Sequence, residues 1–184
     1  GTLQSLMGKL EASRTNFGRA IEIKSDFPEA FLGLGVTLKL LGHFDEAEIA
    51  FKKALDLRSN YAEASANLGN LYNEKGNLKS AAKYFETAVE IKPDFAEALC
   101  NYGSVLRQLN RLQEAEASYR KSLEIKPEFP DALNNLGVLL SDLEDFKAAM
   151  AAFEEATKLS PQLTLGWSNG ASTLERWNEL DQLE

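Results

Sequence analysis

The sequence predicts an all-α protein built from helical hairpins, because residues of the same kind recur every 34 residues along most of its length. Four series share this period: a glycine, an alanine, an aromatic residue and a second small residue. They are Gly35, Gly69, Gly103 and Gly137; Ala47, Ala81, Ala115 and Ala149; Phe17, Phe51, Phe85, Tyr119 and Phe153; and Ala20, Ala54, Ala88, Ser122 and Ala156. A fixed period of this length indicates one helical unit copied in series.

Each period contains two helical stripes. Between residues 96 and 129, the first stripe is spaced i, i+3, i+4 and i+7, which is one face of a helix, and consists of Leu99, Tyr102, Gly103 and Leu106. The second stripe consists of Ala115, Tyr119, Ser122 and Leu123. The two stripes of each period predict an antiparallel helix pair.

Turn residues separate the stripes at matching places. Gly42, Gly76 and Asn110 tolerate the left-handed conformation that ends a helix, whereas Glu144 at the fourth such place fits less well. A proline ends the second helix at Pro93, Pro127 and Pro161. We expect Asp26, Asn60 and Asp94 to cap the first helix that follows.

The repeated glycine predicts a close helix–helix contact. Glycine inside a helix costs about 1 kcal/mol relative to alanine, so its recurrence requires a compensating contact. We expect Gly103 to face the small Ala115, and the aromatic series to fill the space between adjacent hairpins. On this interpretation all these residues are core packing and carry no chemistry.

The pattern resembles the tetratricopeptide repeat (TPR), in which L-G is followed by A-x3-F-x2-A and then P; residues 67–93 match it almost throughout. The resemblance predicts a single array over 1–184, a solenoid of helix hairpins forming a right-handed superhelix with a concave groove. Complete repeats are expected at 28–61, 62–95, 96–129 and 130–163. Residues 1–27 and 164–184 are expected to be partial repeats, the latter with Trp167 at an anchor position and Gly170–Ala171 in place of L-G. Because both partial repeats stop mid-unit, we expect a fragment of a longer protein.

Composition argues against several function classes. The net charge of -8 opposes binding to nucleic acids and to anionic membranes. Cys100 is the only cysteine and His43 the only histidine, so no metal cluster, cofactor site or nucleophile–base pair is predicted. We therefore expect no cofactor, no enzymatic activity, and a cytoplasmic protein.

The first helices carry an asparagine ladder, defined as Asn67, Asn101, Asn135 and Asn169. These residues lie at the sixth position of successive repeats, and Gly33 interrupts the series upstream. A carboxamide offers both a donor and an acceptor, so a row of them can hold the backbone of an extended peptide. The resemblance to O-GlcNAc-transferase-like TPR arrays, where matching asparagines grip peptides, implies the same use. The alternative is that these asparagines are merely solvated.

An acidic ladder occupies the second position of each repeat: Glu29, Glu63, Glu97 and Asp131. Acids in the first turn of a helix interact favourably with its dipole, by about 0.3–1 kcal/mol; the alternative is selection of basic partners. Other groove positions add the acids Glu74, Asp142 and Glu175 and the bases Lys39, Arg107 and Arg176. The lysine of the chaperone-binding carboxylate clamp is missing, since the fifth positions are Leu32, Ala66, Cys100, Asn134 and Ser168.

These features predict a non-catalytic protein-interaction scaffold. It would bind an extended peptide or a partner protein, with basic segments favoured, through the two ladders. The alternative is a structural module that self-assembles into homo-oligomers through its repeat ends.

Overall fold

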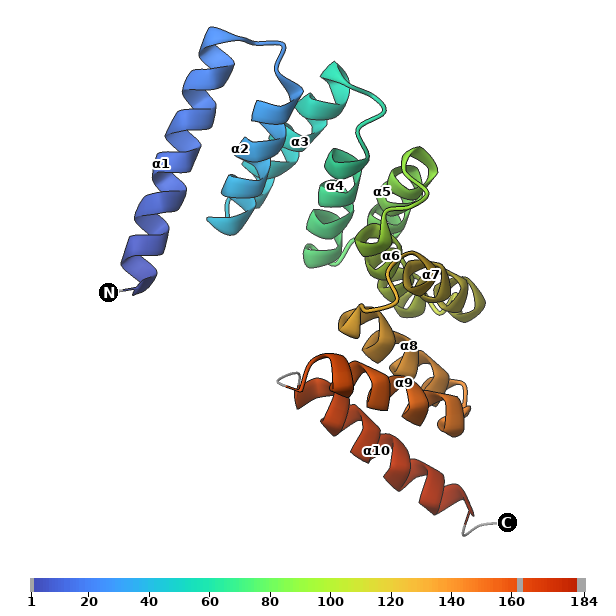
Figure 1. Ribbon diagram of the computed structural model, residues 1–184. Helices are drawn as coiled ribbons and strands as arrows, with labels where there is room; N and C mark the ends of the chain where they lie inside the picture. The colour runs from blue at the N-terminus through green and yellow to red at the C-terminus, as the bar shows by residue number, and fades with distance from the viewer. Residues whose placement is uncertain (1, 162–163, 182–184) are drawn as a thin grey trace. The chain divides into compact units, whose positions relative to one another are not determined.

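The computed structural model describes residues 2–161 and 164–181, and side chains are placed for residues 4–161 and 168–178. This part of the chain contains ten helices and no strand (Figure 1). The helices are α1 (Thr2–Ile23), α2 (Pro28–Leu40), α3 (Phe44–Leu57), α4 (Ala62–Glu74), α5 (Leu78–Ile91), α6 (Ala96–Gln108), α7 (Leu112–Ile125), α8 (Pro130–Asp142), α9 (Phe146–Leu159) and α10 (Thr164–Asp181). The predicted all-α class is confirmed.

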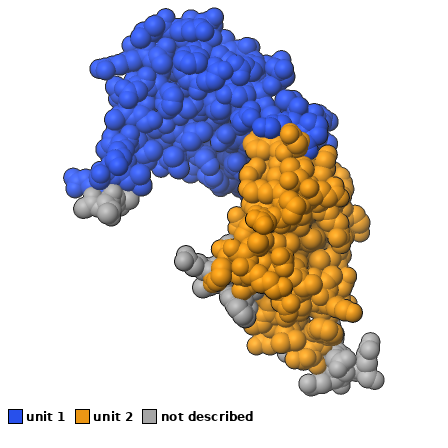
Figure 2. Space-filling model, in the orientation of Figure 1, with its two compact units in different colours: residues 1–93 blue, residues 94–184 orange. Residues whose placement is uncertain are grey.

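The chain divides into two compact units, Gly1–Pro93 and Asp94–Glu184 (Figure 2). In the first unit α2 pairs with α3 and α4 with α5, while α1 packs on α2 and α3 on α4. In the second, α6 pairs with α7 and α8 with α9, α7 packs on α8, and α10 packs on α9 and α8. Each unit is therefore a stack of helix hairpins. The expectation of one array over 1–184 stays a prediction.

The turns inside the hairpins share one backbone conformation. Gly42, Gly76, Asn110 and Glu144 have φ of 81°, 74°, 59° and 63°. In each turn the next residue's N–H returns to the first helix; one example is the 2.9 Å bond from Asp145 N to Leu140 O. Glu144 thus adopts the left-handed conformation despite its side chain, because the closing hydrogen bonds require it.

The helix starts correct one prediction. Helices α2, α4 and α6 begin directly after Phe27, Tyr61 and Phe95, none of which makes a side-chain cap. The expected caps Asp26, Asn60 and Asp94 lie one residue too early in the chain. Side-chain caps occur instead on second helices, where Asn77 accepts from Ser80 N and Asp145 from Ala148 N, both at 3.1 Å.

The repeated glycines face aromatic rings. The atoms nearest to a Cβ built on Gly103 would belong to the Tyr119 ring, at 2.8 Å, and the expected contact with Ala115 stays a prediction. The same arrangement pairs Gly35 with Phe51, Gly69 with Phe85 and Gly137 with Phe153. Four rings therefore lie directly on the helix backbone, where any side chain would displace them.

Candidate peptide-binding surface

The asparagine ladder lies on first helices, as expected: Asn67 on α4, Asn101 on α6, Asn135 on α8 and Asn169 on α10. All four side chains are half-buried. The gap at Gly33 on α2 has a steric cause, because the Phe17 ring of α1 occupies the place where a side chain would begin. Of the four residues, Asn67 belongs to the first unit and the other three to the second.

The amide nitrogens of three ladder residues already donate hydrogen bonds within the protein. Asn67 Nδ2 donates to Glu63 O at 2.8 Å, one turn back on its own helix. Asn135 Nδ2 reaches α6, donating to Ser104 Oγ at 3.3 Å and to Cys100 Sγ at 3.6 Å. Asn169 Nδ2 donates to Asn134 Oδ1 of α8 at 2.9 Å. These bonds fix the amide orientations, so each of the three amides can offer a ligand its acceptor oxygen, and Asn67 and Asn169, which donate one bond each, can also offer a second N–H.

Ser104 is a hydrogen-bonding neighbour of the asparagine ladder that the sequence reasoning missed. Its hydroxyl accepts from Tyr119 Oη at 3.1 Å as well as from Asn135, and it donates to Cys100 O at 3.2 Å. Ser104 lies at the ninth position of its repeat, three residues after Asn101. Residues three apart share one face of a helix, so the period-34 alignment contains the signal that would have identified it.

Cys100 is buried beside Ser104, with 2% of its surface exposed. Burial raises the pKa of its thiol to about 11, and the bond from Asn135 opposes that rise only in part. The thiol is therefore protonated at neutral pH and is not a nucleophile.

The acidic ladder is largely paired within the protein. Glu29 binds Arg58, Glu63 binds Lys92 at 3.3 Å, and Glu97 binds Lys126 at 2.8 Å. Each cation is 29 residues after its acid, at the end of the same hairpin. The hydrogen bond from Arg58 is the main cause that lowers the pKa of Glu29 below its usual value. Asp131 is exposed, and Ser160 stands at the matching distance in its repeat.

The paired cations also lie over aromatic rings at the start of the next repeat. The Arg58 guanidinium is 4.6 Å from the Tyr61 centroid, and Lys126 Nζ is 4.4 Å from that of Phe129. Lys24 and Phe27 repeat the arrangement at 5.4 Å. The sequence reasoning missed this series, although Lys24, Arg58, Lys92 and Lys126 follow the same 34-residue step.

No group of three metal-ligating side chains occurs among the described residues. None of the described helices is both long and apolar enough to cross a bilayer. His43 Nδ1 lies 2.9 Å from Glu46 Oε1 in an exposed turn.

Comparison with known proteins supports the repeat assignment. Models of the tetratricopeptide repeat match residues 30–94, 62–128 and 103–164. No match was found among curated protein sequences.

Several solved structures are similar. The TPR protein YrrB, described as having an unusual peptide-binding site, is 26% identical with a TM-score of 0.72, over 91% of this chain and 86% of that one. MamA is 21% identical with a TM-score of 0.75, over 86% and 93% of the two chains. The thermophilic TPR protein TTC0263 of Thermus thermophilus is 24% identical with a TM-score of 0.71, over 95% of both.

Proposed function

Because the chain belongs to the tetratricopeptide-repeat family, whose members are generally non-catalytic scaffolds, we propose that it binds an extended segment of a partner protein along its first helices. Asn67, Asn101, Asn135 and Asn169 would accept hydrogen bonds from the backbone of that segment. The observation that carries the proposal is that three of these half-buried amides, those of Asn67, Asn135 and Asn169, have nitrogens held by the protein itself. Such pre-oriented acceptors need no ordering on binding.

The mode of recognition follows from the backbone contact. An extended segment presents an N–H at regular intervals whatever its sequence, so the ladder would give affinity with broad specificity. The similar protein YrrB, with its described peptide-binding site, supports a peptide as the ligand class. A scaffold of this kind needs no cofactor, and neither nucleic acid nor a membrane surface is proposed as a partner.

The test is a titration of an extended peptide pool against the wild type and variants. Each neutral hydrogen bond contributes about 0.5–1.5 kcal/mol, so a single Asn→Ala change should weaken binding modestly. Changing Asn67, Asn101 and Asn135 together should weaken it roughly 10- to 1000-fold. A double variant of the exposed Asn16 and Asn60 to alanine is the matched control. Equal affinities for wild type and triple variant, both folded by circular dichroism, would refute the proposal.

The proposal includes a preference for basic segments, which rests on the net charge of -8 and on exposed Asp131. Glu29, Glu63 and Glu97 contribute less to this preference, because each already forms an ion pair within the protein. We therefore expect basic peptides to be favoured through faster association. Stopped-flow association rates that do not change between low and physiological ionic strength would contradict this part.

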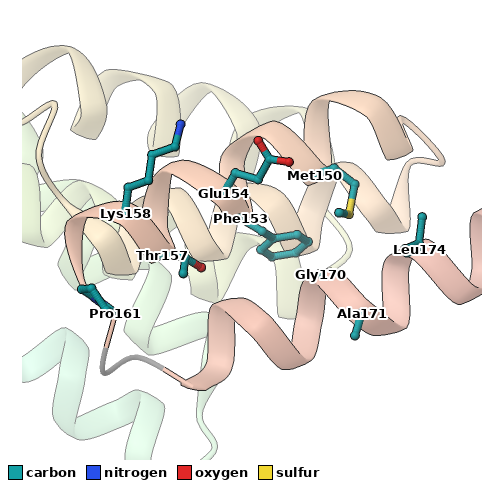
Figure 3. A pocket seen from close by; sticks show the side chains of 9 residues that line it. All are labelled: Met150, Phe153, Glu154, Thr157, Lys158, Pro161, Gly170, Ala171 and Leu174. Atoms are coloured by element: carbon teal, nitrogen blue, oxygen red, sulfur yellow. The ribbon is translucent and has the colours of Figure 1, made fainter.

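Self-assembly is the second candidate, and one surface favours it. A hollow of about 590 Å³ lies between α9 and α10, lined by Met150, Phe153 and Leu174 among others (Figure 3). Leu6 and Met7 on α1 are more than half exposed, so α1 of a second copy could fill the hollow with apolar side chains. Light scattering over a dilution series would then show a mass that rises with concentration and falls in a Leu174→Asp variant. A constant mass would exclude this candidate.

We also propose a cytoplasmic location, which fits a chain whose one cysteine, Cys100, has no partner for an internal disulfide. Cell fractionation should recover the chain with cytoplasmic markers. Recovery in a secreted fraction would contradict the location without affecting the binding proposal.

A further inference from the structure

Ion pairs link successive first helices in both units. Lys39 Nζ of α2 lies 2.8 Å from Glu74 Oε1 of α4, and Arg107 Nη1 of α6 lies 2.9 Å from Asp142 Oδ2 of α8. In both cases the cation holds the twelfth position of one repeat and the acid the thirteenth of the next, 35 residues later. This geometry shows where a carboxylate sits when two first helices pack side by side.

The step from α8 to α10 breaks the rule. Ser141 holds the twelfth position and Arg176 the thirteenth, again 35 residues apart. Arg176 Nη1 donates to Ser141 Oγ at 3.4 Å, and its guanidinium lies 5.7 Å from the Phe146 centroid. No carboxylate lies within ion-pair distance of Arg176 in the described part of the chain. Among the described side chains of α8 and α10, this step therefore has a cation at the position of the acid and no carboxylate paired with it.

The surroundings of Arg176 supply further donors. Ser141 is 5% exposed and accepts from Thr173 Oγ1 at 3.0 Å as well as from Arg176. Because the Ser141 oxygen accepts both of these hydrogen bonds, its hydroxyl proton can be donated to a ligand. A hollow of about 150 Å³ adjoins these groups and is also lined by Asn169 and Ser172. Asp142 borders it as well, and its charge is opposed by Arg107 at 2.9 Å.

We infer that this hollow binds the side-chain carboxylate of an aspartate or glutamate in the bound segment, with Arg176 as counter-ion and Ser141 as a second donor. A guanidinium beside a hydroxyl matches an anion with two acceptor oxygens. Because Asn169 of the asparagine ladder lines the same hollow, a segment held by the ladder would place one side chain there. The inference rests on the proposed function. It concerns one acidic residue, whatever the charge of the rest of the segment.

The first experiment selects a random peptide library on the full chain, on Arg176→Gln, on Arg176→Glu and on Arg120→Gln. Arg120 is the control, since it loses the same charge from α7, where its partner is Glu116 of the same helix. Wild type and Arg120→Gln should enrich Asp or Glu at one peptide position. Arg176→Gln should lose that enrichment, and Arg176→Glu should replace it with Lys or Arg.

The second experiment is a double-mutant cycle on one enriched peptide and its Glu→Gln form. Each single change, Glu→Gln in the peptide or Arg176→Gln in the protein, should weaken binding about three- to tenfold, and the two together no more than either alone. Additive effects would overturn the inference, because the two groups would not be in contact. A competition with free phosphate or acetate at millimolar concentration is the further control. If either anion removed peptide binding altogether, the inference would be overturned, because the hollow would then be a site for a small anion.

The outcomes separate this inference from the proposed function. If no peptide is enriched on wild type, the peptide-binding proposal fails, and this inference fails with it. If peptides are enriched and their binding depends on Asn67, Asn101 and Asn135, but acidic residues are not selected or survive in Arg176→Gln, only the inference about Arg176 fails.

Discussion

At the scale of single residues, backbone positions without side chains decide how closely the helices pack. Gly103 lies under Tyr119 and Gly33 under Phe17, so in both cases a ring occupies the volume of a missing side chain. The period-34 glycine series was visible in the sequence. The residue nearest to Gly103 was not, because the spacing places Ala115 and Tyr119 on the same stripe of the second helix. Only the rotation of α7 about its axis determines which of the two lies nearer.

Replacing Gly103 by alanine tests this packing. The new Cβ would lie 2.8 Å from the Tyr119 ring, and overpacking of this kind costs typically about 1–3 kcal/mol. Gly18→Ala is the control, since a Cβ there meets nothing within 4 Å and alanine should stabilise the helix by up to about 1 kcal/mol. Urea unfolding of both variants measures whether the free energy of unfolding falls in Gly103→Ala and rises in Gly18→Ala. Equal unfolding midpoints for Gly103→Ala and the wild type would contradict the contact.

At Glu144, by contrast, introducing a glycine should stabilise the protein. Its φ is 63°, a value that residues with a Cβ adopt at a cost of about 1–2 kcal/mol. Glycine would remove that cost, although it loses more backbone entropy on folding. Glu144→Gly should therefore raise the free energy of unfolding by about 0.5–1 kcal/mol. The reverse change, Gly76→Ala at φ of 74°, should lower it. A melting temperature that falls in Glu144→Gly would show that the carboxylate has a role in the turn.

At the scale of helices, polar contacts hold neighbouring hairpins of the first unit together. Glu48 of α3 accepts from Tyr72 Oη of α4 at 2.7 Å, from Lys52 at 2.8 Å and from Lys75 at 3.0 Å. The hydrogen bond from Lys52, followed by that from Tyr72, lowers the pKa of Glu48 to about 2. Tyr72 and Lys75 lie far from Glu48 in sequence, so the pattern of residues could not predict their contacts, whereas Lys52 is four residues away on the same helix.

This lowered pKa has a defined pH signature. A carboxyl group whose folded pKa is depressed stabilises the protein above its ordinary pKa of 4.5, and the contribution disappears as pH falls from about 4.5 to about 2. Glu48→Gln should therefore be less stable than the wild type at pH 7, and the difference should close near pH 2. Glu116→Gln, which affects one pair within α7, should show a smaller difference at pH 7. A gap that does not depend on pH would exclude the ionised carboxylate as its cause.

Helix positions were largely predictable, and side-chain partners were not. The first helices begin at Pro28, Ala62, Ala96 and Pro130, the residues from which the repeats were counted, because an exact period fixes the register. The asparagine ladder was also identified from its period. The amide orientations of Asn135 and Asn169 depend on Ser104 and Asn134, which contact them only once two first helices pack side by side.

At the scale of the whole molecule, each hairpin depends on its neighbours, and the terminal helices have fewer of them. In the described part of the chain α1 packs on α2, whereas α4 packs on α2, α3 and α5. Stability in repeat proteins is approximately a sum of such nearest-neighbour terms.

Hydrogen exchange should report this difference. Amides of α1 should exchange with deuterium faster than those of α4, because local opening of α1 breaks one helix interface and opening of α4 breaks three. Mass spectrometry of peptides covering 2–23 and 62–74 measures both at once. Equal protection of the two helices would indicate that α1 is held by contacts with a second molecule, which the dilution series would then reveal.

The ion pairs also determine how such a protein can change its length during evolution. The contacts from Glu29 to Arg58 and from Glu97 to Lys126 lie within one repeat, so duplication or loss of 34 residues would carry each pair along intact. The pair Lys39–Glu74 spans two repeats, and deletion of 62–95 would bring Gln108 to the place of Glu74. A gene that gains or loses repeats would therefore keep its hairpins and reshuffle the charges along the first helices. If the first helices bind partners as proposed, recombination would change which partners are recognised before it changed whether the protein folds.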